Sequence, residues 1–336
     1  MTKGKKKTNK DKKKKLQLAF YWAASCGGCE IAVLDIDEKI LDVIEIADIL
    51  FWPVAIDTKY KDVEAMKDKS IDVCFFNGAI RTEEQERMAH LLRKKSKILV
   101  AFGACATNGG IPGLANIANR DEIFNVAYID NPSTDNPKKV VPKTSVKIKE
   151  GTLTLPEFYD TVKTLDQTVD VDYYLPGCPP TPEQVLTAVT AIAENKLPPK
   201  GSVIGPLKSV CDECRFEKTE KKIKEIKRVY EVDKIEDKCL LEQGIICLGP
   251  ATRGGCGARC LDANMPCTGC GGPTPNSMDQ GAKMISALAS ILGLEGEEKM
   301  SDEEVQKLID QVVDPVGTFY KYGLPSALIN KKVMKK

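Results

Sequence analysis

Cysteine is the residue type in this chain with the most chemistry to offer. The sequence of 336 residues holds 13 cysteines and a single histidine, His90. Pairs at 26/29, 211/214 and 267/270 have the C-x2-C spacing of a thiolate clamp for metals. The lysine-rich start of the chain shows no secretory signal, so we expect a cytoplasmic protein. In that compartment many cysteines indicate metal or redox ligands before disulfides.

The first candidate site combines cysteines from distant parts of the chain. They are Cys26 and Cys29 in C-G-G-C, Cys105 in G-A-C, and Cys178 in P-G-C-P-P. Each motif directly follows an expected strand, and a parallel sheet would bring such positions to one edge. Four thiolates there can bind a 4Fe–4S cluster. A thiolate-bound zinc ion and a thioredoxin-type redox pair are the alternatives.

Alternating strands and helices must position these motifs. Apolar runs predict strands at 16–24, 49–54, 71–76, 98–102 and 171–175. Helical periodicity predicts helices at 31–46, 83–94 and 182–195. A Gly/Pro/Asn-rich stretch covers 103–117, and a hairpin is expected at 146–155 around Glu150-Gly151. This alternation predicts an α/β domain with a doubly wound parallel sheet over residues 16–200.

A different organisation begins at the linker 197–206. Residues 201–336 hold eight cysteines, many glycines and little periodicity until about 277. The eight are Cys211, Cys214, Cys239, Cys247, Cys256, Cys260, Cys267 and Cys270. We expect a second, smaller and irregular domain organised by its cofactors, with structural zinc as the alternative to clusters. Spacing alone does not divide the eight cysteines into groups.

The same half contains three segments with recognisable patterns. A charged stretch at 217–238 predicts a solvated helix face or a strand pair. Two helices are expected after it, the first at 279–292. The second is opened by Ser301, whose spacing to Glu304 is that of a capping box.

Composition argues against several other functions. Residues 1–15 hold nine lysines and predict a disordered, solvated tail, with a basic arm for an acidic partner as the alternative. The rest of the chain has no basic stripe interleaved with aromatics for nucleic acid, and no 18-residue apolar run for a membrane. No G-x-G-x-x-G follows the first strand, so no dinucleotide site is expected. We interpret Cys74 as an inert buried thiol and His90 as a surface residue.

With these motifs in place, the chain resembles the small subunits of nickel–iron hydrogenases. In that family a flavodoxin-like domain holds the proximal cluster through C-x-x-C, G-x-C and P-G-C-P-P, and a C-terminal domain carries two further clusters. The segment from Cys239 to Cys247, followed by L-G-P, is similar to the family's two cysteines followed by G-P. The resemblance covers residues 16–325. It is strongest to the F420-non-reducing (viologen-reducing) hydrogenases of methanogens, whose small subunit associates with heterodisulfide reductase.

The resemblance implies three 4Fe–4S clusters and assigns their ligands. The proximal set is Cys26, Cys29, Cys105 and Cys178. The distal set is Cys211, Cys214, Cys239 and Cys247. The medial set is Cys256, Cys260, Cys267 and Cys270. Periplasmic members have histidine in place of Cys211 and no fourth medial cysteine like Cys260. Because thiolate in place of imidazole lowers a cluster's potential, we expect a relay of low potential.

The function that the resemblance implies is electron transfer. Hydrogen would be split on a nickel–iron large subunit, and no catalytic residue is assigned here. Electrons would then pass through the proximal, medial and distal clusters to a low-potential acceptor. That acceptor would be a small iron–sulfur subunit with heterodisulfide reductase subunits and flavin-based electron bifurcation. Glu30, next to Cys29, is interpreted as an acid of a helix's first turn, with proton relay as the alternative.

Three other interpretations stay open. The first is the small subunit of an F420-reducing hydrogenase. The second is a complex-I-type relative, although such proteins have adjacent cysteines where this chain has C-G-G-C. The third is a zinc-binding scaffold protein.

Overall fold

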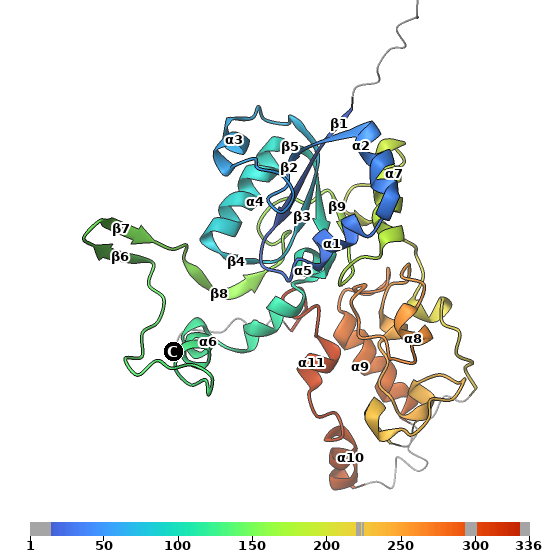
Figure 1. The fold of residues 1–336 in the computed structure, drawn as a ribbon. Coiled ribbons are helices and arrows are strands. Elements are labelled where there is room, and N and C mark those ends of the chain that lie inside the picture. The colour runs from blue at the N-terminus through green and yellow to red at the C-terminus, as the bar shows by residue number, and fades with distance from the viewer. Residues whose placement is uncertain (1–14, 220–222, 224, 293–300, 330–336) are drawn as a thin grey trace, which may run out of the picture.

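A six-stranded parallel sheet forms the centre of the protein (Figure 1). The computed structural model describes residues 15–219, 223, 225–292 and 301–329. The sheet order is β10-β9-β5-β3-β1-β2, which is the flavodoxin-like order. Its strands are β1 (Leu16–Trp22), β2 (Ala47–Phe51), β3 (Ile71–Asn77), β5 (Ser96–Phe102), β9 (Tyr173–Leu175) and β10 (Ser202–Val203). The expected fold class is confirmed.

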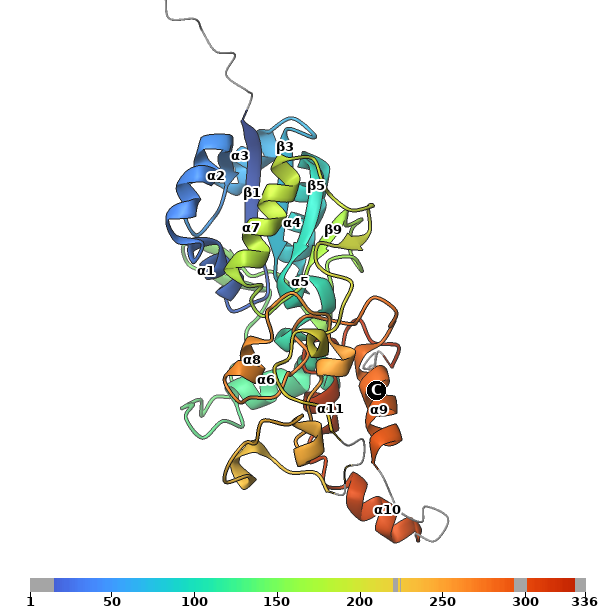
Figure 2. The same ribbon diagram turned by 90° about the vertical axis from the view of Figure 1, so that its right-hand side faces the viewer.

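Helices cover both faces of the sheet (Figure 2). On one face α1 (Gly28–Leu34) and α7 (Pro182–Ala193) pack against strand residues such as Phe20, Phe75 and Val100. On the other face α3 (Tyr60–Ala65) and α4 (Glu83–Lys95) pack against the residues that alternate with them. The central strands are therefore apolar on both sides, and this explains why they are continuous apolar runs in the sequence.

Several elements of this half differ from expectation. The helix expected at 31–46 is interrupted, because Asp37 has φ 55° and separates α1 from α2 (Ile40–Ile46). The Gly/Pro/Asn-rich stretch at 103–117, for which no element was expected, forms α5 (Gly103–Asn108) and a 3-10 turn at Ile111–Ile117. The sheet also does not end at β9, because β10 lies in the expected linker.

Three further elements follow or flank the strand–helix pattern. The strands β4 (Ile80–Thr82) and β8 (Phe158–Lys163) form an antiparallel ribbon that we did not expect. The helix α6 (Arg120–Tyr128) was not expected either. The hairpin is confirmed as β6 (Ser145–Ile148) and β7 (Gly151–Thr154).

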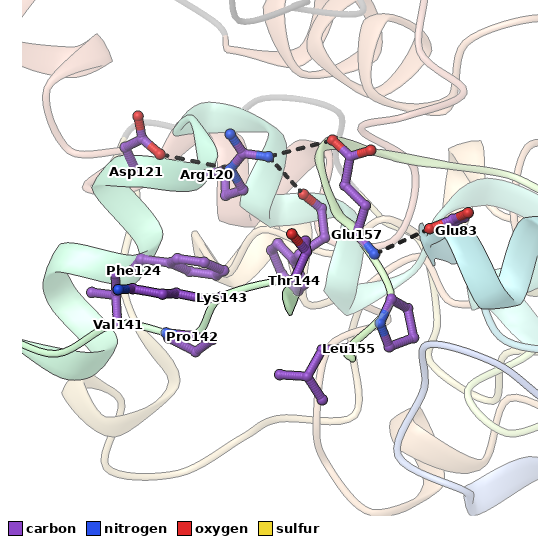
Figure 3. Close-up of a pocket in the computed structure, with 12 residues that line it drawn as sticks. Glu83, Arg120, Asp121, Phe124, Val141, Pro142, Lys143, Thr144, Leu155 and Glu157 are labelled. Carbon is purple, nitrogen blue, oxygen red and sulfur yellow. Dashed lines mark hydrogen bonds and ion pairs between the residues drawn. The ribbon is translucent and has the colours of Figure 1, made fainter. Parts of the chain in front are cut away.

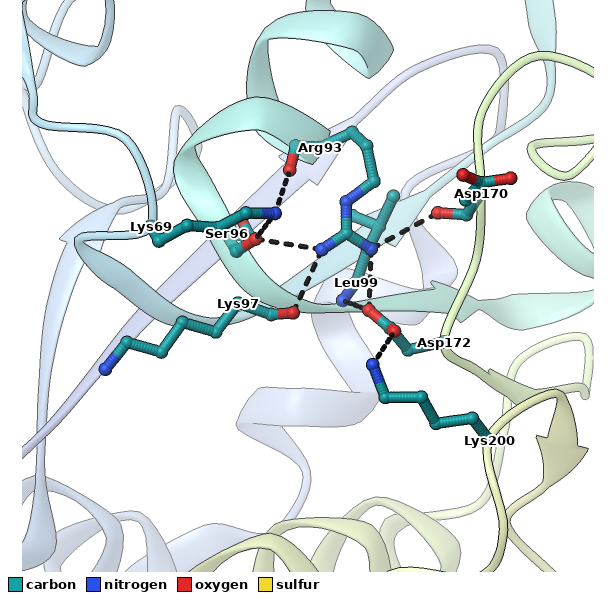
Figure 4. A network of polar contacts seen from close by, with 8 residues as sticks. All are labelled: Lys69, Arg93, Ser96, Lys97, Leu99, Asp170, Asp172 and Lys200. Carbon is teal, nitrogen blue, oxygen red and sulfur yellow. Dashed lines mark hydrogen bonds and ion pairs between the residues drawn. The ribbon is translucent and has the colours of Figure 1, made fainter.

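A buried carboxylate ties the strands together at the edge opposite to the cysteines (Figure 4). Asp172 accepts hydrogen bonds from Arg93 at 2.6 Å, from the Leu99 backbone N–H at 2.8 Å and from Lys200 at 2.8 Å. Arg93 also donates to the carbonyl oxygens of Ser96 and Lys97. The network joins α4, β5, β9 and the approach to β10.

The second half has short elements around its own apolar core. Its helices are α8 (Arg259–Asp262), α9 (Gln280–Ile291), α10 (Asp302–Ile309) and α11 (Pro315–Phe319). The core includes Leu241, Met284 and Leu288 together with Cys247 and Cys267. The described part of 217–238 forms neither helix nor strand pair, but a 3-10 turn at Val229–Glu231 and isolated bridges.

Three expectations from the sequence stay predictions. The lysine-rich tail lies outside the described residues except for Lys15, and so does the side chain of Glu304. The boundary between two domains at residue 200 remains a prediction, with β10 just beyond it.

Candidate functional site

The first four cysteines lie at the carboxyl edge of the parallel sheet. Cys26 follows β1, Cys29 is in the first turn of α1, Cys105 is in α5 directly after β5, and Cys178 follows β9. Burial raises the pKa of Cys29 above its usual range, and the thiolates of Cys105, Cys178 and Cys26 raise it further. The structure thus brings together the four residues that strand ends alone indicated.

Glycines lie directly against two sulfurs of this first group. A Cβ on Gly103 would lie 2.3 Å from the Sγ of Cys29, and a Cβ on Gly110 would lie 2.5 Å from the Sγ of Cys105. Both glycines have positive φ, 83° and 56°. The backbone therefore approaches the sulfurs more closely than any side chain would allow.

A buried polar network lies beside the first group. Glu30 is only 2% exposed and accepts hydrogen bonds from Asn77 at 3.3 Å and from the indole N–H of Trp52. Burial raises the pKa of Glu30, and these two donors oppose the rise. Glu30 does lie in the first turn of α1, as expected, but no pattern in the sequence indicated its two partners.

A second group forms around Cys211, Cys214, Cys239 and Cys247. Burial raises the pKa of Cys211 to about 11, with Cys239 and Cys214 contributing and Lys218 opposing. Burial also raises the pKa of Cys247 to about 12, with Cys211 and Cys239 contributing. A Cβ on Gly249 would lie 3.1 Å from the Sγ of Cys211 and 3.6 Å from that of Cys247. Both sulfurs therefore face the same glycine.

The third group lines a small pocket. Cys256, Cys260, Cys267 and Cys270 all border a cavity of about 40 Å³, together with Pro176 and Gly177 from the loop before Cys178. Burial raises the pKa of Cys270 to about 12, and Cys267, Cys256 and Cys260 raise it further. In the second half, Cys267, Cys256 and Cys260 thus lie near Cys270, and Cys267 also lies near Cys247.

Contacts to sulfur connect the three groups in one order. The backbone of Cys178, in the first group, lies close enough to the sulfur of Cys270 in the third to lower the pKa of that thiol. The backbone N–H of Cys267, also in the third group, donates to the Sγ of Cys247 in the second at 3.3 Å. The third group therefore lies between the other two.

Two residues that the sequence did not single out support these groups. The carboxylate of Glu213, between Cys211 and Cys214, accepts the N–H groups of Gly255 at 2.7 Å and Gly257 at 3.0 Å. It thereby holds the loop that carries Cys256. Burial raises the pKa of Tyr322, and the nearby sulfurs of Cys178 in the first group and of Cys270 and Cys260 in the third raise it further. The position of Glu213 inside a C-x2-C motif was a signal in the sequence that could have identified it. No comparable signal marks Tyr322.

The remaining sequence candidates lie where expected. Cys74 is fully buried within β3, and burial raises its pKa to about 12. His90 is exposed on α4.

Among the described residues, no three Cys, His, Asp or Glu side chains are close enough to share a single metal ion. None of the described helices combines the length and apolar character needed to cross a membrane.

The donor chemistry of all three groups fits a thiolate-bound cluster. Each group offers four sulfurs, and the first two place glycine against them so that no Cβ intrudes. The backbones of Ile111, Gly249 and Gly269 lower the pKa of Cys105, Cys247 and Cys267, which favours the charged form of these sulfurs.

Fold and site together define a flavodoxin-like α/β protein with three groups of four cysteines. The family model of the NADH ubiquinone oxidoreductase 20 kDa subunit matches residues 26–192, which contain the first group. The chain is 47% identical to the iron–sulfur subunit of the F420-non-reducing hydrogenase of Archaeoglobus profundus, over 95% of this chain and 99% of that one. It is 40% identical to the corresponding F420-non-reducing hydrogenase subunit of Methanothermobacter thermautotrophicus, over 96% and 98% respectively.

The chain belongs to this family of F420-non-reducing hydrogenase subunits. It is a hydrogenase subunit and thus part of an oxidoreductase. Among solved structures, a chain of an NAD+-reducing [NiFe]-hydrogenase is similar with a TM-score of 0.48 and 29% identity, covering 55% of this chain and 94% of that one.

Proposed function

We propose that this chain is the electron-transfer subunit of a nickel–iron hydrogenase and that its twelve grouped cysteines hold three 4Fe–4S clusters. When bound, such clusters take up and release single electrons, which would connect a hydrogen-splitting large subunit to a low-potential acceptor. The acceptor that the resemblance implies is a small iron–sulfur subunit with heterodisulfide reductase subunits. No residue of this chain is assigned a catalytic role.

The observation that carries this proposal is the linear order of the cysteine groups. The first group adjoins the third through Cys178 and Cys270, and the third adjoins the second through Cys267 and Cys247. An electron relay needs neighbouring centres with an entry and an exit at its ends. The order supports the first group as proximal, the third as medial and the second as distal.

The chain's own residues would position the centres and set their potentials. Thiolate ligands alone, without imidazole, favour the oxidised state of a cluster. Backbone N–H donors to sulfur act in the opposite direction, because they stabilise added negative charge. Cys211 and Cys260 complete all-cysteine sets, and we therefore propose a low potential along the whole relay.

Metal analysis after anaerobic purification tests the proposal. Three clusters predict about 12 iron and about 12 sulfide per chain. Cys105→Ala should remove about a third of the iron, because one cluster loses a ligand. Cys74→Ala is the matched control, since this buried cysteine belongs to no group, and its iron content should equal that of the wild type. A colourless, zinc-rich protein would contradict the proposal, and so would equal iron loss in both variants.

A further inference from the structure

The hairpin β6–β7 is a structural feature that the electron relay does not use. In Figure 1 it projects from the body, at the end of a long connection that starts after α6. Every residue of both strands is exposed. A two-stranded hairpin that packs against nothing is marginally stable in water. The hairpin would therefore gain stability from packing against another surface.

The two faces of the hairpin differ in character. Val146 lies opposite Leu153, and Thr144 opposite Leu155, so these side chains share a face with Ile148. The four apolar side chains on this face are between 40% and 59% exposed. The other face presents Ser145, Lys147, Thr152 and Thr154. An apolar face on a strand pair is what a packed interface requires.

The apolar face continues into a cleft at the base of the hairpin (Figure 3). Leu155 and Thr144 belong to both. Across the cleft lies Phe124 of α6, and at its end Arg120 and Glu157 form an ion pair of 3.5 Å. The cleft has a volume of about 660 Å³. Hairpin and cleft thus form one continuous surface, which we call the clasp.

The charge of the clasp distinguishes between possible partners. Residues 138–150 include one acidic residue, Glu150, and five lysines, which are Lys138, Lys139, Lys143, Lys147 and Lys149. The carboxylates Glu83, Asp121 and Glu157 also line the cleft, and the last two pair with Arg120. None of the five lysines forms an ion pair with another described residue. Two copies of this chain meeting at the clasp would bring ten lysines together, so self-association is disfavoured. A partner surface with apolar side chains bordered by carboxylates fits instead.

The location of the clasp indicates which subunit that partner is. The chain passes from the hairpin directly into β8, whose Val162 packs with Ala79 against Cys105 of the first group. The first group is the one that faces the hydrogen-splitting subunit in the proposed function, and the next inference rests on that function. We infer that the clasp binds the large subunit, through an apolar and acidic surface of that subunit.

Co-purification from the assembled complex tests the inference. The complex is isolated through a tag on this chain, comparing Val146→Thr/Leu153→Thr with the wild type. Threonine is β-branched and favours strands, so the pair keeps the strand propensity and removes the apolar contact. We expect retention of the large subunit to fall about tenfold or more. Ser145→Thr/Thr154→Ser changes the same strands on the opposite face and should retain the large subunit fully.

The outcomes separate this inference from the proposed function. A wild-type chain that never brings a large subunit overturns the proposed function itself. Full retention by Val146→Thr/Leu153→Thr overturns only the clasp, as does loss of a different subunit while the large one remains. Iron content of each variant reports on folding. Should it fall, deletion of 145–154 decides the question in the same way, because the Leu155 N and Thr144 O lie 3.0 Å apart and a short glycine linker can join the ends.

Discussion

At the scale of single residues, the cysteine sites depend on glycine as much as on sulfur. Gly103 begins α5 at φ 83°, and its missing Cβ is what leaves space for the Sγ of Cys29. Gly201 has nearly the same angle, φ 82°, but a Cβ there would meet nothing within 4 Å. A side chain at either position would therefore strain the backbone to a similar extent, but only at Gly103 would it also meet a sulfur.

This pair of glycines provides a matched test of the first site. Gly103→Ala should displace the sulfur of Cys29 and remove about a third of the iron. Gly201→Ala should keep all of the iron, although it carries the strain of about 1–2 kcal/mol that a left-handed alanine costs. Iron analysis and electron paramagnetic resonance spectra of both variants provide the measurement. Equal iron in the two would mean that the close approach at Gly103 has no role in the site.

At the scale of elements, the sequence predicted the sheet better than the parts around it. Long apolar strands and the order of their motifs were enough to bring Cys26, Cys105 and Cys178 to one edge, because parallel strands end together. The two-residue strand β10 lies in a Pro-rich segment and has no pattern to detect. The strands β4 and β8 were missed because each depends on the other across a long separation in sequence.

The grouping of the second eight cysteines needed the fold for a related reason. Segment 239–270 consists of 3-10 turns, loops and the four-residue helix α8, which together show no periodicity. Cys267 lies beside Cys247 through a backbone N–H to sulfur contact, and Glu213 holds the loop of Cys256 through the N–H of Gly255. These are tertiary contacts, and no local spacing encodes them.

The network around Asp172, which joins strands β5 and β9, leads to a second prediction, about how protein stability depends on pH. Burial alone would raise the pKa of Asp172, but Arg93, Lys200 and the Leu99 N–H outweigh it and lower the pKa. A carboxyl whose pKa falls on folding stabilises the protein above its unfolded pKa of about 3.9. That stabilisation is lost as the pH falls through the lower folded value.

Asp172→Asn should therefore destabilise the protein by about 2 kcal/mol at pH 7, the usual value for hydrogen bonds to a charged group. The difference from wild type should shrink as the pH falls below about 4. Thermal unfolding followed by circular dichroism at several pH values measures both, and acid loss of any bound cluster cancels in the comparison. Lys200→Ala removes only an exposed partner and should behave like wild type. A difference that is constant with pH would exclude the carboxylate as its origin.

At the scale of the whole molecule, one segment joins the two halves. Residues 314–328 begin at α11, where Tyr320 packs on Gly281 of α9, and Leu328 donates its N–H to Asp279 at 2.9 Å. In between, the Tyr322 carbonyl accepts the N–H of Gly110 at 3.0 Å, beside Cys105. The segment therefore contacts the second half and the first cysteine group at once, and it holds the neighbouring groups in place.

Pro325 is a second point where this segment meets the first half. A Cβ on Gly113 would lie 2.4 Å from the Cδ of Pro325, and Gln167 donates to the Pro325 carbonyl at 2.8 Å. Gly113 does not have a positive φ, so alanine there is unfavourable only because of the proline ring. Gly113→Ala should lower the unfolding free energy and loosen the segment, whereas in a Pro325→Ala background the same change should cost little.

A double-mutant cycle on Gly113 and Pro325 measures how strongly the halves are coupled. The double variant should be more stable than the sum of the single losses predicts, by about 1 kcal/mol or more. Because Tyr322 lies beside sulfurs of the first and third groups, Gly113→Ala alone should also make iron easier to remove by a chelator. The second substitution should reverse that effect. Additive losses in the cycle would mean that the segment binds the first half elsewhere. The positions of the cysteine groups would then not depend on the contact between Gly113 and Pro325.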